Sequence, residues 1–293
     1  MNENPRRLNC KQSILFVSLL ALGFTPAGAS SVSAQEAKPK PADSKSDVRI
    51  ERDLEYLGPD RKEKADLYLP KPRPDDQRGP AVLIIHGGGW VGGDKGAKRE
   101  INIGTTLASH GYVAMSINYV LAPTSQPQAA WPRNLHDCKT AVRWLKLNAD
   151  RLRINPDRIG VIGGSAGGHL AAMVGVTGPE AGLDPDGPQS GPSYQVRAVV
   201  DMYGPLQIRT DSKTSPVAYL DKNDPPFLLL HGTADKTVPV AASEQLAQAL
   251  AKADIPHQLV IIEGAPHTFD LQPKQRDLRP LVLEFFDKHL RIP

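Results

Sequence analysis

One serine near the middle of the chain is surrounded by glycines. The stretch 159–170 reads IGVIGGSAGGHL, and within it residues 163–167, GGSAG, fit the pattern G-x-S-x-G. In a nucleophile elbow this pattern places a serine on a tight, strained turn between a strand and a helix, with its hydroxyl exposed above a sheet. Glycines are needed two positions to either side because the strand and the helix nearly touch there. The pattern predicts that Ser165 is a nucleophile for acyl transfer.

Two other uses of such glycines fail on spacing. A dinucleotide-binding loop needs G-x-G-x-x-G, but Ser165 stands where the second glycine would be, counted from Gly163. A phosphate-binding loop needs G-x-x-x-x-G-K-[ST]. In GGGWVGGDKG, however, Asp94 separates Gly93 from Lys95 and no hydroxyl residue follows. Neither nucleotide-binding motif is present.

A second glycine-rich loop, residues 86–90 with the sequence HGGGW, follows the apolar run AVLII. In loops of this type the backbone N–H groups form an oxyanion hole together with the N–H of the residue after the nucleophile. We therefore expect Gly87, Gly88 and Ala166 to stabilise the negative charge of a tetrahedral intermediate, each by roughly 10²- to 10³-fold in rate. His86 itself is expected to be structural and to bond the backbone of its own loop.

An acid and a base follow the serine in the order that elbow hydrolases use, Ser, Asp/Glu, His. Asp235 comes directly after the strand-like run PFLLLHG, and His267 comes after HQLVIIEG. His267 would take the proton from Ser165 and return it to the leaving group, while Asp235 would hold the imidazole tautomer. Asp201, in VVDMYG, is the alternative acid.

Four other histidines and one cysteine are less suitable for catalysis. His231 ends a strand, His257 starts one at the wrong end of the sheet, and His289 lies in the last helical window. His169 follows the serine by one helical turn and is expected to face the core, although it stays open as an alternative base. Cys138 lies in an apolar-periodic helix and is expected to be a buried core residue.

Strand and helix patterns alternate from residue 48 onward. An initial hairpin is predicted from VRIERDLEYL and KADLYLP, and short apolar runs that end in glycine or polar residues suit parallel strands buried on both faces. Helical windows are predicted at 99–110, 135–152, 166–176, 241–253 and 277–290. This order predicts an α/β protein with a doubly wound, mostly parallel sheet. The segment 177–194 is too rich in glycine and proline to be a helical lid.

The N-terminus has the residue pattern of a targeting signal. Arg6, Arg7 and Lys11 precede a short apolar run and a small-residue site ending SVSAQ, which predicts a signal peptide over 1–34 and export to the periplasm or the medium. An uncleaved membrane anchor is the alternative, although the apolar run is short for a bilayer span. Residues 35–47 are then a flexible leader, and 48–293 form one catalytic domain.

Composition limits the possible partners. The formal net charge is only +3, and part of this net charge comes from the first forty residues, so nothing indicates nucleic acid or an anionic membrane as a partner. Cys10 would leave with the signal peptide, and the single remaining cysteine cannot form an internal disulfide. We expect no cofactor, no metal and no membrane span after cleavage. The oligomeric state is not predicted.

Taken together, HGGGWVGGDK, the segment 131–172 around the serine, DPPFLLLHGTADKTVPV and GAPHTF resemble the α/β-hydrolase superfamily. The most similar branch is the secreted HGGGW/GxSxG esterase/lipase group that includes carbohydrate acetyl- and feruloyl-esterase-like enzymes. The resemblance implies an eight-stranded hydrolase sheet without a large cap domain. It also implies serine carboxylesterase chemistry with no cofactor. Two positions depart from many relatives, which have glycine where Pro266 and Thr268 stand.

The resulting hypothesis is a secreted serine carboxylic-ester hydrolase that acts on short-acyl or aromatic esters, with ester groups on carbohydrates among the candidate substrates. An arylformamidase-like amidase shares a similar HGG-x-W loop and is the alternative, although secretion argues against it. Peptidase activity is disfavoured because the chain has no propeller-sized extra domain. A non-catalytic binding protein would have lost a member of the Ser-Asp-His set, and all three are present. Four aromatic residues could either line a cleft or only pack: Trp90, Tyr119, Trp131 and Tyr203.

Overall fold

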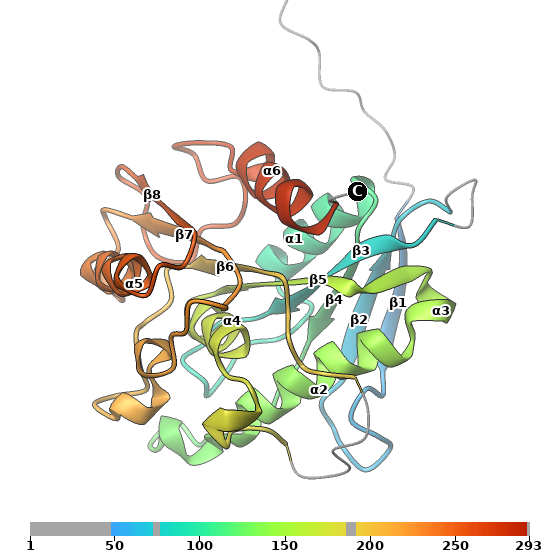
Figure 1. Cartoon of the computed structure of the whole chain (residues 1–293), viewed down its shortest axis with the longest axis horizontal. Coiled ribbons are helices and arrows are strands. Elements are labelled where there is room, and N and C mark those ends of the chain that lie inside the picture. The colour runs from blue at the N-terminus through green and yellow to red at the C-terminus, as the bar shows by residue number, and fades with distance from the viewer. Residues whose placement is uncertain (1–47, 73–76, 186–191, 292–293) are drawn as a thin grey trace, which may run out of the picture. The chain divides into compact units, whose positions relative to one another are not determined.

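The apolar runs of the sequence pair into one sheet. The structure is a computed structural model that describes residues 48–72, 77–185 and 192–291, so the predicted signal peptide and leader lie outside the described residues. Within the described part the sheet has eight strands in the order β1-β2-β4-β3-β5-β6-β7-β8 (Figure 1). The strands are β1 (Arg49–Leu54), β2 (Ala65–Leu69), β3 (Gly79–Ile85), β4 (Val113–Ile117), β5 (Ile154–Gly164), β6 (Ala198–Met202), β7 (Phe227–Gly232) and β8 (His257–Ile262).

The sheet is antiparallel only at its first edge. β1 pairs antiparallel with β2, and β2 pairs antiparallel with β4, which confirms the predicted initial hairpin. From β4 through β3, β5, β6 and β7 to β8 every pair is parallel. The carboxyl ends of these parallel strands therefore meet at one edge of the sheet, which is where ligands bind in folds of this kind.

Helices cover both faces of the sheet, and this explains why central strands such as β3 and β7 are buried along their whole length. Along β3, Val82 and Ile84 join one buried cluster, while Leu83 and Ile85 join the other, as alternation along a strand requires. The first cluster includes side chains of α1 (Lys98–Ser109) and α6 (Arg279–Leu290). The second includes side chains from the remaining helices, α2 (Arg133–Leu147), α3 (Ala149–Leu152), α4 (Ala166–Val176) and α5 (Ala241–Lys252). Figure 1 shows α1 and α6 together on one side of the sheet.

The predicted helices form with one correction. The window predicted as a single helix over 135–152 is two helices, α2 and α3, which meet at Asn148. The Asn148 side chain donates a 2.9 Å hydrogen bond to the Trp144 carbonyl. The side chain thus provides a donor for a carbonyl group in the last turn of α2. Local bonds of this kind make asparagine favour helix termini over helix interiors. Cys138 is fully buried in α2, as expected.

The segment 177–194 contains a single turn of 3₁₀ helix, Pro179–Ala181, among its described residues. Other 3₁₀ turns lie at Pro127–Ala130, Ser212–Thr214 and Pro216–Ala218. Within the described ranges no α-helix forms a cap over the sheet edge, in agreement with the predicted architecture. None of the helices described here has the length and apolarity needed to cross a membrane.

Candidate active site

The serine lies on a strained turn at the end of β5. Ser165 has φ 57° and ψ −125°, an unusual conformation for a residue with a side chain, and α4 begins immediately after it. The flanking glycines allow this turn. A Cβ on Gly163 would lie 2.1 Å from the Gly167 carbonyl oxygen, and a Cβ on Gly167 would lie 2.1 Å from the Ile85 oxygen. The backbone approach expected from G-x-S-x-G is therefore present.

The structure brings the three predicted side chains together. His267 Nε2 lies 2.9 Å from Ser165 Oγ, and His267 Nδ1 lies 2.6 Å from Asp235 Oδ2. An ionised carboxylate only accepts, so Nδ1–H donates to Asp235, and Nε2 accepts the hydroxyl proton of Ser165. The His267 side chain keeps 13% of its surface exposed and Asp235 only 1%. The hydroxyl that would attack a substrate is thus bonded to a base whose other side is fixed.

Asp235 is held as a carboxylate by several donors. Its Oδ1 accepts bonds from the backbone N–H groups of Thr237 at 2.8 Å and Val238 at 2.9 Å. Burial by itself would raise the pKa of Asp235, but the bonds from His267 and from these N–H groups outweigh it and hold the pKa below its ordinary value. Asp235 therefore remains negatively charged at neutral pH.

The alternative acid, Asp201, is not joined to the base. It lies within β6, is 2% exposed, and accepts a 2.9 Å bond from the Gly204 N–H. Its carboxyl oxygen packs against the start of α4, because a Cβ on Gly168 would lie 2.2 Å from it. Burial raises the pKa of Asp201 to about 7. The ring nitrogen of His267 that a catalytic acid must orient is bonded to Asp235 instead.

The HGGGW loop lies beside the serine. A Cβ on Gly87 would be 2.7 Å from the Gly164 oxygen and 3.2 Å from Ser165 Cβ. Gly88 has φ +114°, a conformation that residues with a side chain rarely adopt. Gly87 and Gly88 line a cavity of about 440 Å³ together with Ser165 and His267, and Ala166 is the first residue of α4. The residues expected to form the oxyanion hole thus surround the nucleophile.

His86 has the structural role expected from the sequence. It is 1% exposed, its Nδ1 lies 2.7 Å from the Gly87 carbonyl oxygen, and its ring stacks on Tyr119 with the centroids 4.3 Å apart. Burial, the largest effect, lowers the pKa of His86 to about 4. The ring is therefore neutral at pH 7 and donates to its own loop.

The other candidate histidines bond groups other than the Ser165 hydroxyl, and one of them contacts Asp235. His169 is fully buried, with Nε2 2.6 Å from the Thr214 oxygen. His257 begins β8 and His289 lies in α6, as expected. His231, in contrast, places Nε2 3.3 Å from Asp235 Oδ2 and 2.9 Å from the Val238 oxygen. The spacing H-x₃-D in HGTAD was the available signal for this contact.

The four aromatic residues left open pack in the interior and do not line the cavity at Ser165. Trp90, Tyr119 and Tyr203 are buried, and Trp131 packs partly buried against the core. Arg99 is a residue of the site that no sequence motif indicated. Arg99 lines the cavity, and its Nη1 donates a 3.0 Å bond to the hydroxyl of Tyr203.

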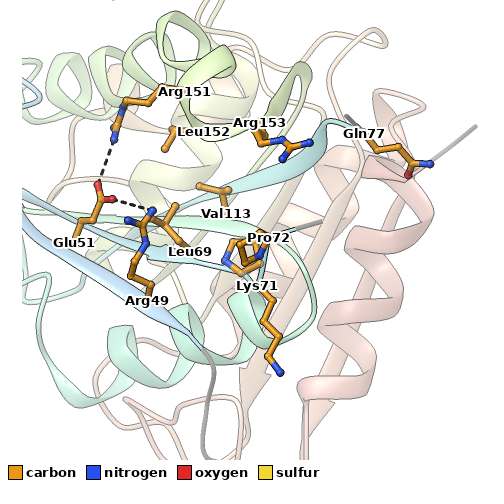
Figure 2. A pocket seen from close by; sticks show the side chains of 11 residues that line it. Arg49, Glu51, Leu69, Lys71, Pro72, Gln77, Val113, Arg151, Leu152 and Arg153 are labelled. Carbon is orange, nitrogen blue, oxygen red and sulfur yellow. Dashed lines mark hydrogen bonds and ion pairs between the residues drawn. The ribbon is translucent and has the colours of Figure 1, made fainter. Parts of the chain in front are cut away.

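A hollow of about 370 Å³ lies at the opposite edge of the sheet (Figure 2). It is bordered by the beginnings of β1 and β4 and by the residues that lead into β5. Arg49 and Arg151 both pair with Glu51, at 3.2 and 3.3 Å, as the dashed lines in Figure 2 show. The pair between Arg151 and Glu51 joins α3 to β1, and none of the predicted site residues lies here. Within the described ranges, no group of three or more metal-ligating side chains could hold a metal ion.

Comparison with known proteins agrees with this geometry. Residues 65–213 match the family described as BD-FAE, which is half of the chain, and residues 204–292 match the prolyl oligopeptidase family. The chain belongs to the BD-FAE family. The predicted membership in the esterase/lipase group of α/β-hydrolases and the predicted fold are both confirmed.

Esterase LipC of Mycobacterium tuberculosis is 30% identical over 252 residues, which are 76% of this chain and 60% of the relative. The chain spans between half and three-fifths of the length of LipC and of two other curated relatives that match most of this chain. Among solved structures, a truncated carbohydrate esterase from gut microbiota is similar with a TM-score of 0.72 and 25% identity, over 85% of this chain and 99% of that one. Thermogutta terrifontis esterase 2 with bound propionate has a TM-score of 0.67 and 27% identity, over 83% and 94%.

Proposed function

We propose that this BD-FAE protein is a serine carboxylic-ester hydrolase that works through an acyl-enzyme on Ser165. The observation that carries the proposal is the continuous hydrogen-bond chain from Ser165 Oγ through His267 to Asp235, on an elbow turn. A hydroxyl bonded to a neutral imidazole, which is in turn bonded to a carboxylate, is the arrangement that activates serine for acyl transfer. The names of the matched relatives, esterases in each of the cited cases, support the same activity.

The reaction follows from the bonded groups. Ser165 Oγ forms a bond to the ester carbonyl carbon while its proton moves to His267 Nε2, and the carbonyl oxygen becomes negative. Backbone N–H groups of Gly87, Gly88 and Ala166 stabilise that oxygen. The carbon–oxygen bond to the alcohol breaks as His267 returns the proton to the leaving oxygen. Water then attacks the acyl-serine by the same route and releases the acid, and Asp235 stabilises the imidazolium in both halves.

The proposed substrates are short-acyl or aromatic esters, including ester groups on carbohydrates. Support comes from two relatives, one named a carbohydrate esterase and one whose structure holds propionate. Four glycines are among the residues that line the cavity at Ser165, and no helical cap lies over it among the described residues. An open site of this kind suits an ester carried on a bulky alcohol, because only the acyl group has to enter.

Export is part of the same proposal. The signal peptide predicted over 1–34 would place the enzyme in the periplasm or the medium, where acetylated or feruloylated polymers occur. N-terminal sequencing of the protein recovered from a secreting host tests this, and the expected first residue is Gln35. A protein that keeps its N-terminus and sediments with membranes would support the anchored alternative instead.

The test of the activity is a substrate panel. It contains p-nitrophenyl esters from acetate to long acyl chains, methyl ferulate, acetylated xylan and N-formylkynurenine as the arylformamide. We expect turnover of the ester substrates with a preference for short acyl chains, together with acetate release from xylan. Hydrolysis of the formamide in preference to every ester would favour the amidase alternative. No turnover of any member would favour a binding protein.

A further inference from the structure

A buried tyrosine lies against the candidate base and bonds the loop that carries it. Tyr203 follows β6, is fully buried, and packs its ring edge against the ring of His267, with the centroids 4.9 Å apart. Its hydroxyl donates a 2.5 Å hydrogen bond to the carbonyl oxygen of Phe269, two residues beyond the histidine. Burial raises the pKa of Tyr203 to about 12, so the hydroxyl keeps its proton and continues to donate.

The same hydroxyl is held from the other side by Arg99 of α1. Arg99 Nη1 donates to it at 3.0 Å, and Arg99 Nε and Nη2 donate to Glu100 Oε1 at 2.8 and 2.5 Å. The Arg99 side chain is 13% exposed and that of Glu100 only 1%. The positive charge of Arg99 is therefore neutralised by Glu100 within the fold. Charge-assisted bonds of this kind are shorter and stronger than those between neutral groups.

The guanidinium also lies against both glycine turns of the site. A Cβ on Gly164 would be 2.7 Å from Arg99 Nη1, and a Cβ on Gly87 would be 3.2 Å from Arg99 Nη2. Ser165 Cβ is at the same 3.2 Å from that position on Gly87. Arg99 therefore contacts the backbone next to the nucleophile and reaches, through Tyr203, the backbone next to the base.

We propose that Arg99 and Tyr203 are positioning residues that hold the His267 loop in register with Ser165. The inference rests on the proposed roles of Ser165 and His267. The loop needs such a support, because Thr268, between the histidine and Phe269, has φ +66°, a conformation that a β-branched residue avoids. The bond to the Phe269 carbonyl fixes the chain just beyond this strained residue. A displacement of about 1 Å at a reacting group costs on the order of 10²-fold in rate.

Tyr203→Phe is the direct test, since it removes one oxygen atom and keeps the ring against His267. We expect kcat for p-nitrophenyl acetate to fall roughly 10- to 100-fold with KM changed less than about threefold, because the reacting geometry is altered and the cavity is not. A second readout is the downfield ¹H NMR signal of the proton between His267 Nδ1 and Asp235. We expect this signal to shift or broaden in the variant.

Tyr112→Phe is the matched control. Tyr112 is also fully buried, its hydroxyl donates a 2.5 Å bond to Asp287 of α6, and its ring packs against Phe286. The Tyr112→Phe variant should lose a comparable amount of unfolding free energy but keep the wild-type kcat and the downfield signal. Arg99→Lys is the second positioning variant and carries the test if Tyr203→Phe does not fold. Lysine keeps the charge but lacks the planar fork that reaches Glu100 and Tyr203 together, so we expect the same readouts to change.

Two results would overturn the inference. One is a kcat within about twofold of the wild type together with an unchanged downfield signal in Tyr203→Phe, or in Arg99→Lys where only that variant folds. The other is an equal loss of kcat in Tyr112→Phe. Ser165→Ala in the same assay distinguishes a wrong positioning role from a wrong proposed function. Retained turnover in Ser165→Ala contradicts the mechanism, whereas an inactive Ser165→Ala beside a fully active Tyr203→Phe contradicts the positioning role alone.

Discussion

At the scale of single residues, the candidate site depends on conformations that ordinary side chains avoid. Ser165 has φ 57° and is kept there by the close approach of β5, α4 and the end of β3. Strain at such a position costs about 1–3 kcal/mol and is retained where the surrounding structure requires it. This conformation holds the Ser165 hydroxyl 2.9 Å from the imidazole of His267.

This strain predicts a stability difference between two inactive variants. Ser165→Gly should be more stable than Ser165→Ala by about 1 kcal/mol, because glycine adopts positive φ without steric cost and alanine does not. Urea unfolding monitored by circular dichroism measures the difference. If the alanine variant proves as stable as the glycine variant, the turn is not strained in the way its dihedral angles indicate.

The two buried aspartates should respond differently to loss of charge. Asp235→Asn should lower kcat roughly 10³- to 10⁴-fold, since an amide cannot hold the imidazole in the required tautomer. Asp201→Asn should keep kcat within about tenfold of the wild type, because Asp201 bonds Gly204 and not His267. Steady-state kinetics with p-nitrophenyl acetate compare them. The reverse order of activities would assign the catalytic acid to β6.

At the scale of elements, the strand ends and the turns after them could be predicted from the sequence, whereas contacts between distant loops could not. G-x-S-x-G and HGGGW specify local backbone, and the order Ser, Asp, His follows from three strand ends that meet at one edge. Arg99 and Tyr203 carry no such pattern, because their bond depends on how α1 packs beside β6. The break between α2 and α3 at Asn148 could not be predicted, because apolar periodicity continues through it.

The backbone of the His267 loop favours glycine at position 268. The resemblance to α/β-hydrolases implies glycine where Thr268 stands, and Thr268 has φ +66°. Thr268→Gly should therefore raise the free energy of unfolding by about 1 kcal/mol. Thr124→Gly is the control, at an exposed loop position outside the positive-φ residues, and should be neutral or slightly destabilising. Thermal unfolding of both variants tests this, and a less stable Thr268→Gly would contradict it.

At the scale of the whole molecule, an apolar core lies on each face of the described sheet. A buried carboxyl group beside these cores makes the stability of the fold depend on pH. The folded-state pKa of Asp201 is about 7, above its ordinary value of 3.8. The folded protein therefore holds a proton there that the unfolded chain releases. The resulting stabilisation is present below pH 3.8 and is lost as the pH rises through about 7.

Asp201→Asn removes this dependence, because an amide does not titrate. Relative to the variant, the wild type should lose about 1.4 kcal/mol of unfolding free energy per pH unit between roughly pH 4 and 7. Urea titrations at several pH values measure the difference, with Asp60→Asn as a control at an exposed carboxylate. Parallel pH profiles for wild type and Asp201→Asn would show that Asp201 ionises as readily in the folded protein as in the unfolded chain.

The central claim is that the Ser165 hydroxyl forms the acyl-enzyme, and turnover by Ser165→Ala tests it most directly. With p-nitrophenyl acetate and a protein shown to be folded by circular dichroism, kcat should fall by roughly 10⁴- to 10⁶-fold. A folded Ser165→Ala variant that turns over the ester at a rate near that of the wild type would contradict the account.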